Sequence, residues 1–192
     1  MKIVVGLGNP GITYSATRHN VGFALIKYLA RTEKIKLREK AFHCLLGRGT
    51  IGQVQVILAL PLTFMNLSGQ ALAALAKRYN IALTDVLVVC DDAALPLGAM
   101  RIRPSGSDGG HKGLRSIIEE LGSSDFARLR IGIGQPPTDA HQKPLTEFVL
   151  GKFSKKETPV IEKTIKDAAE AILLWIKEGA APVMNRFNRK GV

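Results

Sequence analysis

Cysteine, long apolar runs and acidic side chains are all scarce in this chain of 192 residues. The two cysteines, Cys44 and Cys90, are too few for a disulfide framework and lack metal-ligand spacing; Cys90 ends an apolar run and is expected to be a small buried residue. No apolar run approaches the roughly 18 residues of a membrane-spanning helix. The sequence enters a strand-like run directly, so we expect no signal peptide. We therefore expect a protein of the reducing cytoplasm with no membrane partner.

Motifs for several common hydrolase chemistries are also missing. The sequence has no GxSxG nucleophile elbow and no HExxH or comparable metal spacing, and no Ser or Cys stands in an obvious nucleophile setting. These absences favour hydrolysis by activated water over a covalent acyl-enzyme. No residue spacing indicates a metal site, and we expect no cofactor.

Positive charge dominates the composition. The chain has 27 Lys and Arg against 16 Asp and Glu, which gives a net charge of +11. Such an excess favours a polyanionic partner, with nucleic acid first and an acidic membrane surface second. Because 46% of the residues are apolar and 22% charged, the chain can bury a sizeable core, so disorder is not expected.

Strand-like apolar runs alternate with helix-like patterns along the chain. The expected strands are 3–7, 45–49, 54–60, 86–90, 99–103 and 129–133, and the expected helices are 20–31, 68–79, 110–121 and 158–178. This alternation predicts a single α/β domain over residues 1–192, with a mixed, mostly parallel twisted sheet flanked by helices. The turn at Gly52 predicts an antiparallel hairpin, and residues 135–144 are expected to form a mobile loop.

The first strand runs into GLGNPG at residues 6–11, which matches the dinucleotide-binding pattern GxGxxG. A Rossmann unit needs a helix that opens on the third glycine and an acidic residue at the end of the next strand. Here Pro10 and a turn-like segment interrupt that pattern, and Glu33 lies at a helix end. A tight turn that presents Asn9 at the carboxyl edge of the sheet is the better interpretation, and nicotinamide binding is the weaker one.

A histidine and a carboxylate are expected at that same edge. His19 precedes a helix in polar sequence, and Asp91 ends a strand without charges. In open α/β sheets the carboxyl ends of the strands form the ligand crevice. A carboxylate that holds one imidazole nitrogen leaves the other free to take a proton from water. Since adjacent side chains of an extended chain point to opposite sides, only one of Asp91 and Asp92 can face the site, and we predict Asp91. A surface or capping role for the histidine and a turn-forming role for one carboxylate are the alternatives.

Two further segments are candidates for substrate binding. Asn66 precedes a helix, so its amide either caps that helix or binds a carbonyl or peptide group, with Met65 as an apolar wall. The glycine-rich segment 105–113 lies between a basic strand and a helix, where helix-opening N–H groups suit phosphate contact. His111 and Lys112 open that helix. The arginines that could add positive charge on neighbouring strands are Arg101, Arg103, Arg128 and Arg130.

These segments closely resemble the bacterial-type peptidyl-tRNA hydrolase family, in the same order and over nearly the whole chain. The matching motifs are GLGNPGxxYxxTRHNxGF at 6–23, PxTFMNxSGxA at 61–71, DDxxLPLGxxRxR at 91–103, GSxGGHxG at 106–113 and FxRLRIGIGxP at 126–136. The resemblance implies a monomeric α/β enzyme without a metal. It also implies hydrolysis of the ester that joins a peptide to the 3′-terminal ribose of tRNA, so that peptidyl-tRNA is the partner and free tRNA returns to translation.

The resemblance implies a role for each matching residue. His19 would be the catalytic base, with Asp91 as its partner. The residues that would bind the substrate are Asn9, Tyr14, Met65, Asn66, His111 and Lys112. Arg103 and Arg130 match the positions that grip the tRNA 5′-phosphate.

One position of the glycine-rich motif departs from the family pattern. The usual GGHNG reads GGHKG here, so Lys112 replaces an Asn that helps to position the water and the substrate. A charged lysine cannot accept a hydrogen bond from water, although it could stabilise an oxyanion or contact phosphate. We expect its ammonium to stay in solvent or on phosphate, because long side chains at a crevice rim keep their charge hydrated.

Two other function classes stay open at this point. One is a non-catalytic RNA-binding relative, as in the plant organellar splicing factors that resemble the hydrolase; the candidate catalytic residues argue against it and Lys112 argues faintly for it. The other is a nicotinamide oxidoreductase. An absorbance titration without cofactor binding would dispose of the second.

Overall fold

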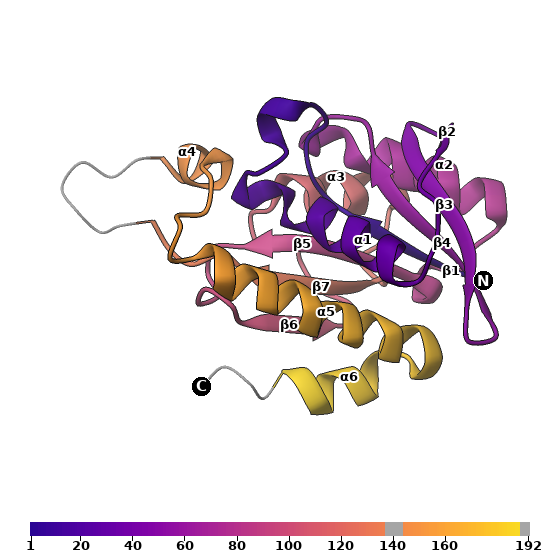
Figure 1. Cartoon of the computed structure of the whole chain (residues 1–192). Coiled ribbons are helices and arrows are strands. Elements are labelled where there is room, and N and C mark those ends of the chain that lie inside the picture. The colour runs from indigo at the N-terminus through magenta and orange to yellow at the C-terminus, as the bar shows by residue number, and fades with distance from the viewer. Residues whose placement is uncertain (137–143, 189–192) are drawn as a thin grey trace.

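A computed structural model describes residues 1–136 and 144–188, so most of the expected mobile loop at 135–144 lies outside the described residues. Seven strands form one sheet in the order β2-β3-β4-β1-β5-β7-β6, with helices on both faces (Figure 1). The strands are β1 (Lys2–Gly6), β2 (Glu39–Ala41), β3 (Cys44–Ile51), β4 (Val54–Pro61), β5 (Val86–Asp92), β6 (Met100–Arg103) and β7 (Ala127–Gly132). The helices are α1 (Val21–Thr32), α2 (Ser68–Tyr79), α3 (Lys112–Leu121), α4 (Leu145–Leu150), α5 (Thr158–Glu178) and α6 (Ala180–Phe187).

The sheet is mixed, as predicted. Its centre is parallel, because β1 pairs with β4 and β5, and β5 pairs with β7, all in the same direction. The predicted β3–β4 hairpin is present, and β6 closes the other side as an antiparallel strand against β7. The carboxyl ends of β1, β5 and β7 therefore meet at one edge, which is where the ligand crevice of an α/β sheet lies.

Alternating side chains of the central strands supply two apolar cores. Val4, Leu87 and Leu129 pack on one face of the sheet with α1, α5 and α6, where Trp175 is fully buried. Val5 and Val88 pack on the opposite face with α2 and α3. Because both faces are covered, these strands read as continuous apolar runs in the sequence.

Close packing of α1 against β1 fixes the start of this helix. A side chain on Gly6 would collide with the carbonyl of Gly22, and a side chain on Gly22 would collide with the backbone of Leu7. The first glycine of GLGNPG is thus required for helix–strand contact. His19 lies two residues before α1, so this contact also sets the position of the histidine.

Three short elements do not follow from the sequence pattern: β2, α4 and α6. They span 3, 6 and 8 residues, which is too short for hydrophobic periodicity to reveal. Among the helices of residues 1–136 and 144–188, none is long and apolar enough to cross a membrane.

Candidate active site

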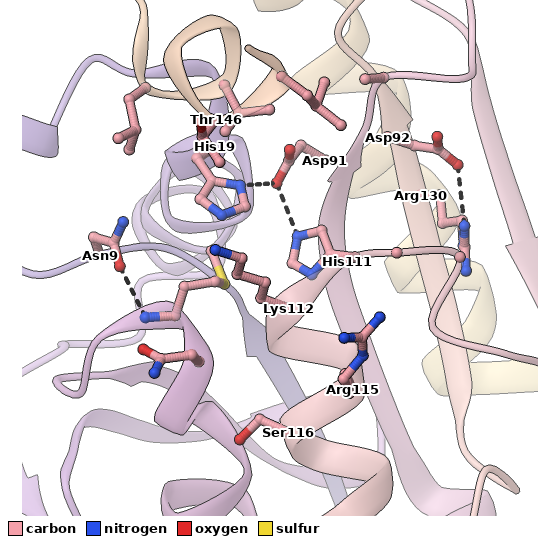
Figure 2. A pocket seen from close by; sticks show the side chains of 18 of the residues that line it. Asn9, His19, Asp91, Asp92, His111, Lys112, Arg115, Ser116, Arg130 and Thr146 are labelled. Atoms are coloured by element: carbon pink, nitrogen blue, oxygen red, sulfur yellow. Dashed lines mark hydrogen bonds and ion pairs between the residues drawn. The ribbon is translucent and has the colours of Figure 1, made fainter.

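A pocket of about 830 Å³ opens at the carboxyl edge of the central strands (Figure 2). Its wall comes from the turn after β1, the 3₁₀ turns Arg18–Asn20 and Met65–Leu67, the end of β5, the glycine-rich loop with α3, and α4. The predicted site residues that line it are Asn9, His19, Met65, Asn66, Asp91, His111, Lys112 and Arg130. Segments far apart in the sequence therefore meet in one concave site.

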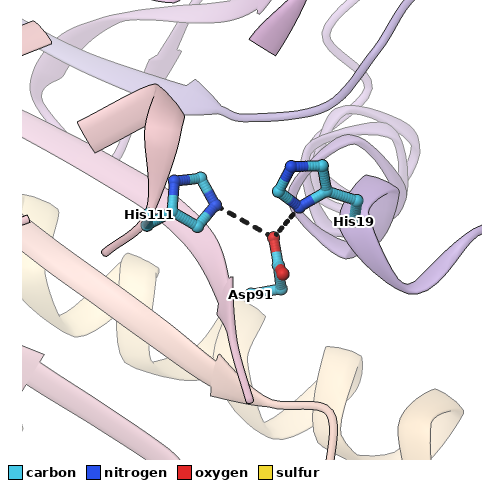
Figure 3. A group of neighbouring side chains, drawn as sticks. All are labelled: His19, Asp91 and His111. Carbon is cyan, nitrogen blue, oxygen red and sulfur yellow. Dashed lines mark hydrogen bonds and ion pairs between the residues drawn. The ribbon is translucent and has the colours of Figure 1, made fainter. Parts of the chain in front are cut away.

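His19 and Asp91 form a hydrogen-bonded pair in this pocket. The Nδ1 atom of His19 lies 2.7 Å from Oδ1 of Asp91. The alternation of side chains along β5 explains why Asp91 reaches His19. Asp91 lies on the same face of the strand as Leu87 and Val89, and this face packs against α1 and the turn that carries His19. The imidazole donates its Nδ1 hydrogen to the carboxylate, and its other nitrogen, Nε2, points away from Asp91 (Figure 3).

The Asp91 carboxylate is almost completely buried yet ionised. Burial alone would raise the pKa of Asp91, but hydrogen bonds and charge from His111 and His19 outweigh it and hold that pKa well below its usual range. An ionised carboxylate only accepts hydrogen bonds. Asp91 therefore fixes both neighbouring rings as donors toward it at neutral pH.

His111 makes the second hydrogen bond to the same oxygen. Its Nε2 atom lies 3.0 Å from Asp91 Oδ1, while its Nδ1 atom accepts from the backbone N–H groups of Gly113 and Leu114 at the start of α3. The family resemblance predicts that His111 is one of the substrate-binding residues. In the structure both ring nitrogens already have protein partners, so the ring touches the pocket without a free polar atom.

One group of side chains among the described residues could in principle hold a metal ion. It consists of His19, Asp91 and His111, whose potential ligand atoms all lie within 4.8 Å of one another. A metal on Nε2 of His111 would require hydrogen on Nδ1. That hydrogen would face the two backbone N–H donors that now bond to Nδ1. The donor set therefore fits a hydrogen-bonded network better than a metal centre.

Asn9 ties three segments of the pocket together. Its Oδ1 accepts from the backbone N–H of Met65 at 2.8 Å, and its backbone exchanges two 2.9 Å hydrogen bonds with the side chain of Asn20. Because Oδ1 is occupied, the amide NH₂ of Asn9 is the group left to donate to a substrate. Nothing in the sequence pattern singles out Asn20, because the hydrogen bonds of its side chain to the backbone of Asn9 form only once the two turns meet.

The other expected substrate residues lie in different surroundings. Asn66 is exposed and lines the pocket; it does not cap α2, whose N-cap residue is Leu67. Lys112 is exposed and extends along the pocket from the first residue of α3 (Figure 2). Tyr14 is half-buried in a separate 3₁₀ turn and is not among the described residues that line the pocket.

Comparison with known proteins identifies the family. A family model described as peptidyl-tRNA hydrolase matches residues 3–192. The peptidyl-tRNA hydrolase of Syntrophomonas wolfei is 48% identical, with 98% of this chain and 100% of the relative covered. The chain belongs to the peptidyl-tRNA hydrolase family. The Desulfitobacterium hafniense relative is 46% identical over 98% of this chain and 100% of its own length. A crystal structure of peptidyl-tRNA hydrolase from Acinetobacter baumannii has a TM-score of 0.92 and 36% identity and covers 100% of this chain and 96% of that chain.

Arginines line one face of β6 and β7 in this member of the family. Arg130 donates to Ser107 O at 2.9 Å and pairs with Asp92 at 3.3 Å, whereas Arg103 is exposed. Arg128 is different, because it is 1% exposed. Its guanidinium donates to four backbone carbonyls, those of Gly106, Ser107, Ser124 and Phe126. Arg128 therefore braces the glycine-rich loop and does not add charge to the surface, contrary to the expectation from sequence.

Arg18 fixes the histidine turn to the far wall of the pocket. Its guanidinium makes two hydrogen bonds to Glu157, at 3.0 and 2.9 Å, and lies over the rings of Phe148 and Phe153. Its backbone N–H donates to Gly151 O at the end of α4. The same short helix α4 supplies an apolar wall of the pocket, so His19 and this wall share one anchor.

We expect Glu157→Gln to destabilise the protein mainly above about pH 4.3, the usual glutamate pKa. The hydrogen bonds of Arg18, against a smaller effect of burial, lower the pKa of Glu157 to about 2. A depressed carboxyl pKa contributes stability that is present above the unfolded pKa and lost as pH falls through the folded one. The pair is about a quarter exposed on the glutamate side, so we expect a loss of roughly 1–3 kcal/mol at pH 7 and a flatter stability profile between about pH 4.3 and 2.

Urea unfolding at pH 7 and at pH 2 to 4 would measure this effect. Glu170→Gln is the matched control. Glu170 is exposed on helix α5, which begins directly after Glu157, and its substitution should change the stability little. Equal stability of wild type and Glu157→Gln at pH 7 would show that the pair contributes nothing.

Proposed function

We propose that this chain hydrolyses the ester between a peptide, or an N-blocked amino acid, and the 3′-terminal ribose of tRNA, so that free tRNA is released for translation. The observation that carries the proposal is the His19–Asp91 hydrogen bond of 2.7 Å inside a pocket of about 830 Å³, in a chain of this family. A base oriented by a buried carboxylate beside open space is what the activation of water requires.

The reaction begins at the free nitrogen of His19. Nε2 takes a proton from a water molecule as that water attacks the ester carbonyl, and Asp91 stabilises the imidazolium that forms. When the tetrahedral intermediate collapses, the imidazolium returns the proton to the 3′-oxygen of the ribose, which leaves as a hydroxyl. The amides of Asn9 and Asn66 orient the carbonyl and the adjoining peptide group, with Met65 as an apolar wall.

Positive charge around the pocket serves the RNA backbone in this proposal. Arg130 lines the pocket and Arg103 is exposed two strands from β5. Lys112, which lines the pocket and is exposed on the first turn of α3, adds to this charge. We propose that the chain acts as a monomer in the cytoplasm, with no metal in the reaction.

An assay of ester hydrolysis tests the function directly. Release of a labelled N-acetyl amino acid from N-acetyl-aminoacyl-tRNA should be catalytic and should continue in excess chelator. The rival proposal is a non-catalytic RNA-binding relative, which would bind the tRNA and release nothing. Tight binding without turnover would therefore replace the hydrolase proposal with the binding one.

Removal of Arg103 should weaken RNA binding and leave the chemical step intact. Arg103→Gln is expected to raise KM with kcat nearly unchanged and to lower the salt slope of tRNA binding by about one unit or less, because one phosphate contact is lost. Lys163→Gln, on α5 over the other face of the sheet, is the control for a lost charge. Unchanged affinity and slope in Arg103→Gln would place the RNA-binding surface elsewhere.

A further inference from the structure

We infer that His111 is a positioning residue that locks Asp91 in one orientation and thereby aims the free nitrogen of His19 into the pocket. The inference rests on the proposed function, since it takes His19 as the base. It concerns the same carboxylate oxygen, which accepts from His19 at 2.7 Å and from His111 at 3.0 Å (Figure 3).

The helix α3 decides which nitrogen of His111 carries hydrogen. Nδ1 accepts from Gly113 N at 3.1 Å and from Leu114 N at 3.3 Å, so it must present a lone pair. The hydrogen of the neutral ring is then on Nε2, which is the atom that faces Asp91. A second hydrogen on Nδ1 would oppose two N–H donors and the positive end of the helix dipole. His111 therefore donates to Asp91 from Nε2, while its Nδ1 stays an acceptor at the start of α3.

Two donors on one oxygen restrict Asp91 more than one donor would. The carboxylate cannot rotate about its side-chain bonds without losing bonds to two separate elements, the turn Arg18–Asn20 and the start of α3. The two rings are 5.1 Å apart between centroids and tilted by 46°, so they do not stack, and their coupling runs through Asp91. His111 thus acts on the reaction through another residue.

The Nε2–H group of His111 also changes how strongly Asp91 attracts a proton on His19. Hydrogen bonds from the helix N–H groups polarise the His111 ring and strengthen its Nε2–H donor. That donor draws charge from the shared oxygen, so the oxygen stabilises an imidazolium on the opposite side less strongly. The hydrogen bond from His111 therefore weakens the attraction of Asp91 for a proton on His19.

Other charges near the pair would be the same with and without His111. Asp92 on β5 pairs with Arg130 on β7, and Arg18 pairs with Glu157. The remaining charged residues that line the pocket are Lys112, Arg115 and Glu119 on α3. Because a single substitution leaves these groups in place, a difference between variant and wild type reports on the lost donor.

His111→Asn separates the two contacts of the ring. Asparagine is a favoured N-cap residue, so it can still accept from the start of α3, but it is too short to reach Asp91. We expect kcat to fall about tenfold, as for one lost hydrogen bond, with KM within about twofold. The acid limb of the kcat/KM profile should move up by about half a pH unit. His43→Asn, at an exposed histidine on the β2–β3 turn, should change neither quantity.

Several results would overturn the inference. One is that His111→Asn changes neither kcat nor the pH profile. Another is a lower kcat with no shift of the acid limb. A third is a raised KM alone, which would assign the ring to substrate binding. Nitrogen-15 NMR of histidine-labelled wild type gives a test that needs no turnover. The His111 ring should show hydrogen on Nε2 only, and hydrogen on Nδ1 would contradict the inference even if the enzyme proved inactive in the ester assay.

Discussion

Replacing His19 by Ala should lower kcat by at least about two decades, the usual range for a lost general base. The alanine leaves Asp91 without the ring that takes the proton from water, while the carboxylate keeps its second donor, His111. The arginines that we propose to bind the tRNA are untouched, so KM should change little. Single-turnover hydrolysis of N-acetyl-aminoacyl-tRNA would measure the chemical step directly.

Stability and binding serve as controls for this variant. The His19→Ala protein should remain folded, because Arg18 and Asn20 still anchor the turn after the hydrogen bond of the imidazole to Asp91 is lost. It should also bind uncleaved substrate as tightly as wild type. Turnover within threefold of wild type would end the proposal that His19 is the base.

Asp91→Asn should slow turnover by roughly two to four decades, with the fold intact, because an amide of the same shape replaces the charge that orients and stabilises the imidazolium. The amide can also donate toward the ring and favour the wrong tautomer of His19. Circular dichroism and unfolding would confirm the fold, and single-turnover rates would give the loss.

Asp92→Asn is the matched control for the carboxylate. Asp92 pairs with Arg130 and accepts from the backbone of Ala94, on the side of β5 away from His19. Its amide variant should keep kcat within a few-fold of wild type. Should turnover survive Asp91→Asn and fall in Asp92→Asn, the two carboxylates would have to exchange roles.

The parts of the fold that the sequence predicts are those with a strong local signal. The expected helix 68–79 coincides with α2, which ends at a left-handed Asn80 as its C-cap. The strand expected at 86–90 continues to Asp92, because Asp91 and Asp92 still pair with β7. Hydrophobic runs mark the buried part of a strand and miss the polar end that reaches the site. The carboxyl-edge rule predicted that His19 lies near the end of β5, and side-chain alternation selected Asp91 over Asp92 as its partner.

What the sequence does not predict depends on long-range partners. Arg18 and Glu157 are 139 residues apart, and the sequence around each residue gives no sign that they form an ion pair. Arg128 looks like a surface cation by its residue type, yet the carbonyls that gather around it form only in the folded loop. The role of His111 as a helix cap was likewise hidden, since histidine is not among the preferred N-cap residues.

The close contact of Gly6 on β1 with Gly22 on α1 limits how far the helix can move relative to the sheet, and therefore how far His19 can move from Asp91. Neither position has room for even one methyl group, so a Gly6→Ala or Gly22→Ala chain must push α1 away from β1. The hydrophobic contacts of α1 can slide to absorb such a shift, but the hydrogen bond between the ring before this helix and the carboxylate on β5 cannot. Gly6, the first glycine of GLGNPG, is therefore required by the packing of α1 on β1, which is a reason for a glycine at this position that does not involve a nucleotide.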